Sequence, residues 1–168
     1  MTELIISDAT PQDAEGIAEI WNPIIRDTVI TFNPSQRSAD DIAAMIRSRQ
    51  RDGHAFLLAE ADGRLLGFAT YAQFRAGPGY ARCMEHTINL ARDAQGRGVG
   101  RKLLLALECH ATAAGHHVMV AAITGANTAS VAFHAAMGYV HVGRMPQVGW
   151  KFGSFHDLVL MQKFLVRQ

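Results

Sequence analysis

A glycine-rich stretch, QGRGVGRKLL at residues 95–104, has the residue types and spacing that most directly suggest chemistry. Gly96, Gly98 and Gly100 alternate with other residues, and an apolar stretch follows at once. Between an expected strand and an expected helix, backbone N–H groups here would point toward the positive end of the helix, where phosphate oxygens bind well. Glycine also allows close approach of the backbone. The stretch predicts a phosphate site; the alternative is a glycine-rich helix cap without a ligand.

Two common phosphate loops do not fit this spacing. A Walker A loop ends in Gly-Lys-Ser/Thr, whereas Gly100 is followed by Arg101 and Lys102. A Rossmann loop needs G-x-G-x-x-G in a first βαβ unit, whereas this run reads G-x-G-x-G and lies late in the chain. The pattern Gln/Arg-x-x-Gly-x-Gly/Ala remains, and residues 95–100 match it.

The elements that position this loop follow from the apolar pattern. Apolar residues at helical spacing predict helices from about residue 11, from 38 or 40 to 51, over 98–114 and over 127–137. Strands are expected at 4–7, 81–91, 117–123, 139–145 and 155–164, with a hairpin over 55–74 that turns at Asp62-Gly63. Strands come both in runs and in alternation with helices, which predicts an α+β or mixed α/β fold. We expect one domain over residues 1–168.

Composition and charge exclude several classes of protein. The formal net charge is +1, so no broad basic field is available to attract nucleic acid or a membrane surface. The N-terminus does not resemble a signal peptide, and no apolar run reaches the length of a membrane span. Cys83 and Cys109 lack metal-ligand spacing, and no metal site is expected. We expect a cytoplasmic protein with reduced thiols.

Together with later residues, the loop resembles the GCN5-related N-acetyltransferase (GNAT) superfamily. Residues 127–139 resemble that family's N-x-x-S-x-x-x-(H/Y) motif with its following Gly-Tyr. Glu85-His86-Thr87, the stretch 145–153 with its Gly-x-Lys-x-Gly pattern, and Asp157 resemble the branch that acetylates phosphinothricin and methionine sulfoximine. The resemblance implies a mostly antiparallel central sheet, splayed between its fourth and fifth strands and flanked by about four helices.

The same resemblance implies acetyl-CoA as cosubstrate. The pantetheine arm would lie along the fourth strand, and the glycine loop would hold the pyrophosphate, with charge-assisted contacts from its two arginines. A splayed strand leaves N–H and C=O groups that need partners, and pantetheine amides can supply them. The implied cofactor-binding residues are Ile88, Asn89, Leu90, Gly96, Arg97, Gly98, Val99, Gly100, Arg101, Asn127 and Ser130.

Acetyl transfer to an amine needs a base, a polarised carbonyl and a leaving thiolate. Glu85, in an otherwise apolar strand, is the candidate general base, and an ion pair with Arg75 or Arg82 is the alternative. A backbone N–H near Ile88 is the expected oxyanion donor. His134 is the candidate proton donor to the thiolate or a cofactor contact, with a plain helix-face histidine as the alternative.

The acceptor site follows from the branch resemblance. Arg75 matches the branch's substrate arginine, whose guanidinium can hold a carboxylate in bidentate fashion. Lys151 is a second candidate anion contact, with a solvated turn lysine as the alternative. His86 should face away from Glu85 and pack, although its place in the motif also makes it a candidate substrate contact. The acceptor set is Arg75, Ala76, Gly77, Glu85, His86, Thr87 and Lys151.

The sequence thus predicts an acetyl-CoA-dependent acyltransferase. Its expected acceptor is a small-molecule amine, namely phosphinothricin, methionine sulfoximine or methionine sulfone, which would give the protein a role in detoxification or antibiotic resistance. Relatives in this branch are usually dimers, so the resemblance implies a homodimer. Acetylation of another amine and a non-catalytic acyl-CoA sensor are the competing hypotheses. A polyamine or aminoglycoside acceptor would require an acidic cleft, and few acidic residues lie near Arg75 and Glu85 in the sequence.

Overall fold

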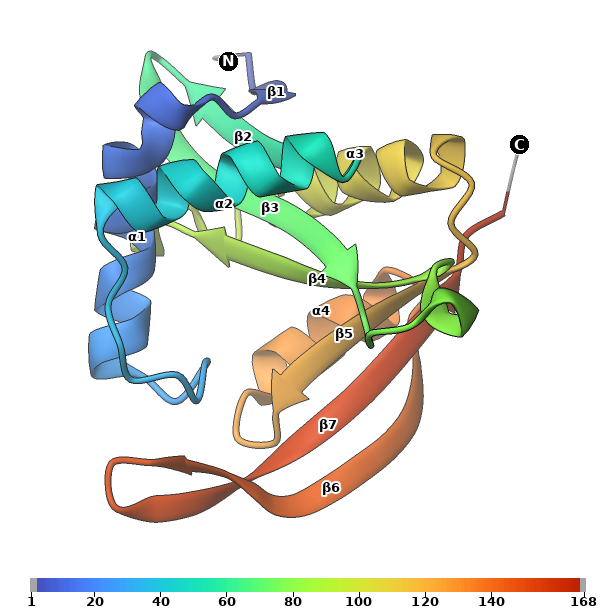
Figure 1. The fold of residues 1–168 in the computed structure, drawn as a ribbon. Coiled ribbons are helices and arrows are strands. Elements are labelled where there is room, and N and C mark those ends of the chain that lie inside the picture. The colour runs from blue at the N-terminus through green and yellow to red at the C-terminus, as the bar shows by residue number, and fades with distance from the viewer. Residues whose placement is uncertain (1–2, 167–168) are drawn as a thin grey trace.

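One seven-stranded sheet organises the computed structural model, which describes residues 3–166. Its spatial order is β1-β2-β3-β4-β5-β7-β6, and every neighbouring pair is antiparallel except β4 and β5 (Figure 1). The strands are β1 (Ile5–Asp8), β2 (Phe56–Ala61), β3 (Arg64–Gln73), β4 (Cys83–Leu90), β5 (Val118–Thr124), β6 (Val140–Lys151) and β7 (Ser154–Phe164).

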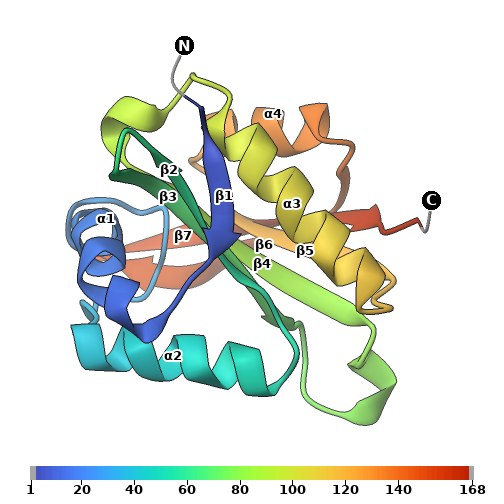
Figure 2. The ribbon, with the colours of Figure 1, turned by 90° about the horizontal axis from the view of Figure 1, so that it is seen from above.

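Helices cover both faces of the sheet. They are α1 (Ala14–Asp27), α2 (Ala39–Arg51), α3 (Val99–Ala113) and α4 (Thr128–Ala136). Figure 2 shows α1 and α2 together on one side of the sheet and α3 and α4 on the other. Side chains alternate along β2: Phe56 and Leu58 pack in the core with α1 and α2, whereas Leu57 and Ala59 pack in the core with α3.

Local sequence signals set the ends of these elements. Asp62 and Gly63, with φ of 54° and 69°, form the tight turn expected between β2 and β3. Ser38, one of two residues expected to begin α2, caps it by accepting from the Asp41 N–H. Short 3-10 helices at Pro11–Asp13, Pro78–Tyr80 and Arg92–Ala94 complete the described chain. The mixed α/β expectation with four flanking helices is therefore confirmed.

The β6–β7 hairpin differs from expectation. The sequence predicts a strand ending near Met145, but β6 continues to Lys151 through an irregular stretch between Met145 and Gly149. Phe152 and Gly153, with φ of 52° and 72°, then make the two-residue turn into β7. The resulting long ribbon lies at the bottom of Figure 1, with its turn on the same side as the C-terminal end of α1.

The sheet opens between β4 and β5. Their parallel pairing covers Cys83–Glu85 against Val118–Val120 and stops there, whereas β4 pairs with β3 along its whole length. Beyond Glu85, β4 therefore has a strand neighbour on one side only, and β7 holds β5 on its far side. The predicted splay is present, and it separates the two strand segments on which the candidate site is built.

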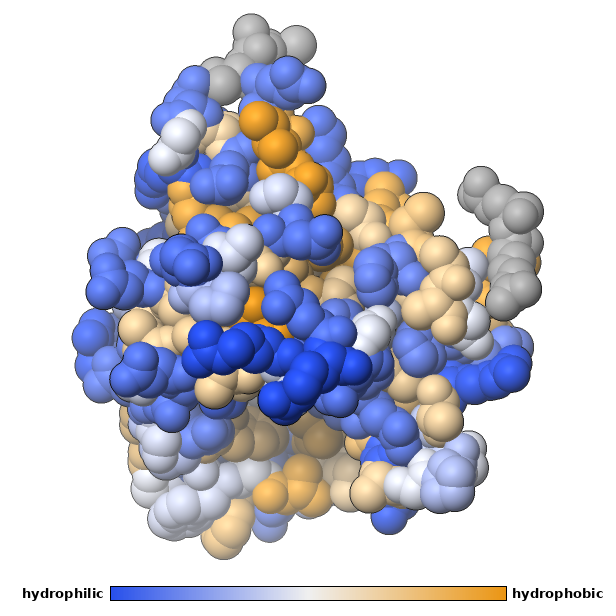
Figure 3. All heavy atoms as spheres, turned by 45° about the horizontal axis from the view of Figure 1, so that its top comes forward, coloured by the Kyte–Doolittle hydropathy of each residue, from blue (hydrophilic) through white to orange (hydrophobic). Residues whose placement is uncertain are grey.

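The outer surface adds two observations. On the face shown in Figure 3, hydrophilic residues predominate, and strongly hydrophobic ones occur singly or in small groups. Within residues 3–166, no helix has both the length and the apolar character that crossing a membrane requires.

Candidate active site

Two adjoining cavities occupy the opening between β4 and β5. The smaller has a volume of about 250 Å³ and is lined by Glu85, and the larger, of about 1570 Å³, reaches the glycine loop. Six residues line both cavities: Ile30, Ile88, Asn89, Asn127, Ser130 and His134. The arrangement gives a broad groove beside a small chamber.

Glu85 stands in the wall of the smaller cavity. Its side chain is half-buried, and burial raises the pKa of its carboxyl above the usual range. Within the described residues it forms no ion pair, so the alternative pairing with Arg75 or Arg82 is not present. A half-buried carboxylate without a cationic partner is suited to accept a proton.

His86 and His134 form a buried pair across the opening. Their rings stack with centroids 5.0 Å apart, and their Nε2 atoms lie 3.1 Å apart. His134 Nδ1 lies 2.7 Å from the Ser130 carbonyl oxygen, which can only accept, so this nitrogen carries the hydrogen. Its Nε2 then accepts from His86 Nε2–H, and His86 Nδ1 is left as a buried atom without a partner.

Burial lowers the pKa of both histidines, and for His86 to about 3. The neutral pair is therefore the stable form at neutral pH. As the strand alternation predicts, His86 lies on the core side of β4 with Met84, and it also lines the smaller cavity.

The glycine loop ends at the N-terminus of α3. Gly98 is the N-cap residue with φ of 77°, a conformation that glycine adopts without strain. The first helical hydrogen bond runs from the Lys102 N–H to the Gly98 carbonyl, so the N–H groups of the residues between them have no acceptor within the helix. Such a terminus, beside a glycine-lined wall of the larger cavity, can hold phosphate oxygens.

Most of the expected cofactor-binding residues meet in the larger cavity. Those that line it are Ile88, Asn89, Leu90, Gly96, Gly98, Gly100, Arg101, Asn127 and Ser130. Arg97 is exposed and Val99 is buried in the core, so the side chains of these two lie outside the cavity lining. Asn127 caps α4 by accepting from Ser130 N–H at 3.1 Å, which leaves its amide NH₂ available to donate.

Gly67 on β3 keeps β4 in place behind this lining. A Cβ atom at Gly67 would lie 2.8 Å from the Asn89 carbonyl oxygen and would overlap the side chain of Leu90. The close approach explains why glycine stands in the middle of a buried strand, where it otherwise costs stability.

The structure does not bring all the expected acceptor residues together. Thr87 lines the smaller cavity beside Glu85, but Arg75, Ala76 and Gly77 lie exposed in the segment after β3 and outside both linings. The Arg75 guanidinium instead lies 5.5 Å from the centre of the Tyr80 ring.

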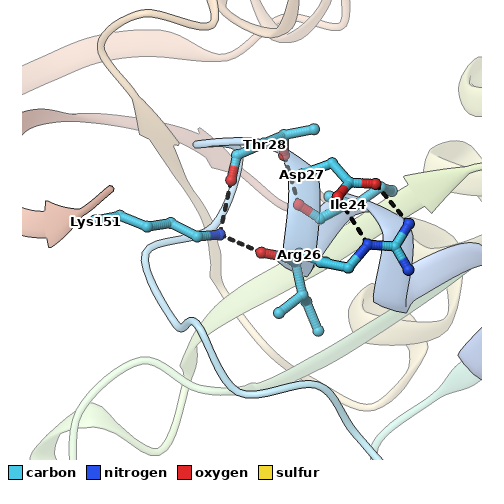
Figure 4. A network of polar contacts seen from close by, with 6 residues as sticks. Ile24, Arg26, Asp27, Thr28 and Lys151 are labelled. Atoms are coloured by element: carbon cyan, nitrogen blue, oxygen red, sulfur yellow. Dashed lines mark hydrogen bonds and ion pairs between the residues drawn. The ribbon is translucent and has the colours of Figure 1, made fainter. Parts of the chain in front are cut away.

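Lys151 is buried, which rules out the alternative of a solvated turn lysine. Its side chain is 3% exposed, and its ammonium donates to the backbone carbonyls of Ile25, Thr28 and Thr31. Figure 4 shows Lys151 extending from the end of β6 toward the end of α1. All three ammonium hydrogens are therefore engaged, and Lys151 lines neither cavity.

Several lining residues were not found from the sequence. They are Trp21, Ile30, Thr31, Phe32 and Thr124. Apolar residues in the otherwise polar stretch after α1, TVITFNPSQ, were the available signal, since a surface loop has little reason to carry them. Thr124, at the end of β5, keeps its Oγ1 buried without a partner. Within residues 3–166, no group of three or more His, Cys, Asp or Glu is arranged to hold a metal ion.

Comparison with known proteins identifies the family. A profile of the acetyltransferase (GNAT) family matches residues 19–139, so the chain belongs to this family. It is 38% identical over 154 residues to the L-amino acid N-acyltransferase MnaT of Escherichia coli, covering 92% of this chain and 90% of that one. It is 39% identical over 158 residues to an L-methionine sulfoximine/L-methionine sulfone acetyltransferase of Pseudomonas paraeruginosa, covering 94% and 92%.

A solved relative shares the whole architecture. The phosphinothricin acetyltransferase of Sinorhizobium meliloti, solved in complex with acetyl-CoA, superposes with a TM-score of 0.92 at 31% identity, over 96% of this chain and 88% of that one. The protein is accordingly an N-acetyltransferase, related to enzymes that acetylate methionine sulfoximine and phosphinothricin.

Proposed function

We propose that the protein transfers the acetyl group of acetyl-CoA to the amino group of a small amino-acid analogue: L-methionine sulfoximine, methionine sulfone or phosphinothricin. The observation that carries the proposal is Glu85, a half-buried carboxylate without a cationic partner, in a chamber of about 250 Å³ that shares six lining residues with the glycine-lined groove. A chamber of that size suits a small amine, and the relatives named above support the choice among amines.

The groove residues fit coenzyme A. The N–H groups at the start of α3 suit the pyrophosphate, and Arg97 and Arg101 supply positive charge near it. Val99 contributes through its backbone, because its side chain belongs to the core. The pantetheine arm would pair with β4 at residues 88–90, where β5 has diverged, and the Asn127 amide would donate to it.

Direct transfer assigns one proton step to Glu85. Its carboxylate takes a proton from the acceptor's ammonium, directly or through a water. The free amine then attacks the thioester carbonyl, so that a C–N bond forms and the C–S bond breaks. Coenzyme A leaves as the thiolate, which takes up the extra proton lost by the attacking nitrogen, directly or through a water. A backbone N–H near Ile88 stabilises the oxygen of the carbonyl as charge develops on it. The raised pKa of Glu85 makes it a better base than an exposed carboxylate.

For His134, of the two roles expected from sequence, we propose contact with the cofactor. It lines both cavities, but its Nδ1–H is engaged by the Ser130 carbonyl and its Nε2 faces His86. In this neutral state, its Nε2 has no proton to give the thiolate.

The acceptor's carboxylate needs a positive partner, and we propose Arg75. Within the described residues, neither lysine nor arginine lines the smaller cavity, so the charge must come from outside its lining. Ala72 of β3 pairs with Glu85 of β4, and Arg75 lies three residues after Ala72. Ala76 and Gly77 continue the same segment. We propose that Thr87 and His86 complete the acceptor's surroundings from β4.

We also propose that the protein is a homodimer that buries the outer face of the β6–β7 ribbon. This ribbon carries most of the exposed large apolar side chains: Val140, Val142, Met145, Val148, Trp150, Phe152, Phe155 and Phe164. Exposed apolar side chains gathered on one hairpin are typical of a protein–protein interface. Light scattering of the parent and of Trp150→Glu tests it, and a monomeric parent would refute it.

Thiol release from acetyl-CoA tests the main proposal. Acceptors are L-methionine sulfoximine, methionine sulfone, L-phosphinothricin, spermidine and an aminoglycoside, each with the parent, Glu85→Gln and Glu60→Gln. Glu60 is a half-buried carboxylate on β2 outside both cavities, so it is the matched control. We expect turnover with the first three only, a loss of at least a hundredfold in kcat for Glu85→Gln and none for Glu60→Gln.

The same panel separates the competing functions. Turnover of spermidine or the aminoglycoside alone would show that the protein acetylates another kind of amine. Arg75 would then have no acceptor carboxylate to bind. Binding of acetyl-CoA with no turnover of any amine, in parent and Glu85→Gln alike, would favour a non-catalytic sensor.

A further inference from the structure

Lys151 joins two parts of the chain that are far apart in sequence. It is the last residue of β6, and its three carbonyl partners lie at the end of α1 and in the segment that follows; Figure 4 shows the two nearest the helix end. The distances to the carbonyl oxygens of Thr28 and Thr31 are 2.7 and 2.8 Å. The Ile25 carbonyl lies in the last turn of α1, where carbonyls run out of N–H donors within the helix, and a cation there also interacts favourably with the negative end of the helix dipole.

The segment that Lys151 holds forms a wall of the acceptor chamber. Residues 28–32 have no regular secondary structure, yet Ile30, Thr31 and Phe32 all line the cavity that contains Glu85. Because the backbone of this wall takes part in no helix or strand, its conformation depends on contacts with other parts of the chain.

The β6–β7 ribbon supports the same segment at a second point. A Cβ atom at Gly149 would overlap the ring of Phe32, which packs directly against this glycine. Phe32 also stacks on His156 of β7 with ring centroids 5.9 Å apart, and the His156 Nε2 donates to the Lys151 carbonyl at 3.0 Å. Backbone, aromatic and ammonium contacts therefore all connect the ribbon's turn with the wall.

The chain that follows residues 28–32 is fixed by a separate pair of hydrogen bonds. The Asn22 side chain donates to the Arg37 carbonyl and accepts from the Arg37 N–H, both at 2.9 Å. These bonds return the chain to α1 after the wall has been formed. Lys151 thus anchors the wall segment itself, and Asn22 anchors the chain beyond it at Arg37.

We propose that Lys151 is a positioning residue that fixes residues 28–32 as a wall of the acceptor chamber and so sets affinity for the acceptor without contacting it. The role replaces a direct anion contact, because no ammonium hydrogen is left for a substrate. The kinetic part rests on the proposed amino-acid acetylation, whereas the structural part does not.

Lys151→Met tests the proposal, since it keeps the length of the side chain and removes every donor. Lys163→Met is the matched control: Lys163 is a partly buried lysine of β7 whose ammonium pairs with Glu108 at 2.6 Å, far in sequence from the wall and outside both cavities. Lys151→Gln, which retains two donors, serves if the methionine variant fails to fold.

Two readouts are measured on each variant. For Lys151→Met we expect the acceptor KM to rise tenfold or more while the acetyl-CoA KM stays within twofold. Amide hydrogen exchange of Thr28 and Ile30, whose N–H groups donate to the Ile24 carbonyl and the Thr28 hydroxyl, should also rise at least tenfold, with α3 unchanged. Lys151→Gln should fall between the parent and Lys151→Met. Lys163→Met should lower the melting temperature and leave both readouts at parent values.

Failure takes distinguishable forms. Unchanged exchange at Thr28 and Ile30 in Lys151→Met, or an equal rise in Lys163→Met, would overturn the positioning role whether or not the acceptor is known. Faster exchange with an unchanged acceptor KM would overturn the link to affinity. If the parent acetylates none of the amino-acid analogues, the proposed function fails, and exchange alone decides whether Lys151 holds the wall.

Discussion

Acidification should destabilise the protein through His86 before most carboxylates titrate. The folded-state pKa of His86 is lowered from 6.5 to about 3, first by burial and second by the neighbouring His134. Between pH 6.5 and about pH 3, His86 therefore binds a proton in the unfolded chain but not in the folded chain. Stability is fully present above pH 6.5 and is lost progressively as the pH falls toward 3.

The size of the effect follows from linkage. Each pH unit below 6.5 costs about 1.4 kcal/mol, so His86 alone should remove about 2 kcal/mol of unfolding free energy by pH 5. Against a total of roughly 5–15 kcal/mol for a domain, this loss is readily measured.

Urea unfolding of the parent and His86→Gln between pH 7 and pH 5 isolates this contribution. A glutamine amide can still donate to His134 Nε2 but does not titrate, so stability at pH 7 should change by only about 1 kcal/mol. The parent should then lose about 2 kcal/mol more than the variant by pH 5. His141→Gln, an exposed histidine on β6, is the control and should follow the parent. Parallel curves for the parent and His86→Gln would refute the reasoning.

Three further predictions use other features of the structure. Gly98→Ala forces a side chain into a left-handed N-cap and should cost about 1 kcal/mol with a weaker acetyl-CoA affinity, measured by thermal shift with and without acetyl-CoA. Gly149→Ala collides with Phe32 and should cost about 1–3 kcal/mol in urea unfolding while raising the acceptor KM. Ser38→Ala removes the cap that Asp41 N–H uses and should cost about 1 kcal/mol with kcat unchanged; a change in kcat would contradict our placement of α2 outside the site.

The sequence predicted local structure better than it predicted contacts. Asp62-Gly63 and Ser38 act through their nearest neighbours along the chain, so a turn and a helix cap could be recognised from their residues alone. The end of β6 could not, because an irregular stretch between Met145 and Gly149 interrupts the alternation that marks a strand.

The site divides in the same way. The glycine loop could be proposed from its own residues, because a glycine-rich helix terminus is a backbone feature with a short sequence signal. The β4 segment and Arg75 were placed by resemblance alone. Residues 88–90 line the larger cavity, whereas the exposed position of Arg75 shows that a matching residue need not line the chamber of its own chain.

Lys151 shows most clearly that contacts between residues far apart in the chain could not be predicted from the sequence. Its partners lie 120 to 126 positions away, and nothing about a lysine between Trp150 and Phe152 indicates that its ammonium is buried. A lysine near a substrate site suggests an anion contact, because that is the commonest use of its charge. Backbone carbonyls at and just after a helix end are an equally good partner for an ammonium, and only the fold brings these three within reach. If acceptor preference differs among relatives that share the glycine loop and Glu85, the stretch equivalent to residues 28–32 and its anchor are therefore where we expect the difference to originate.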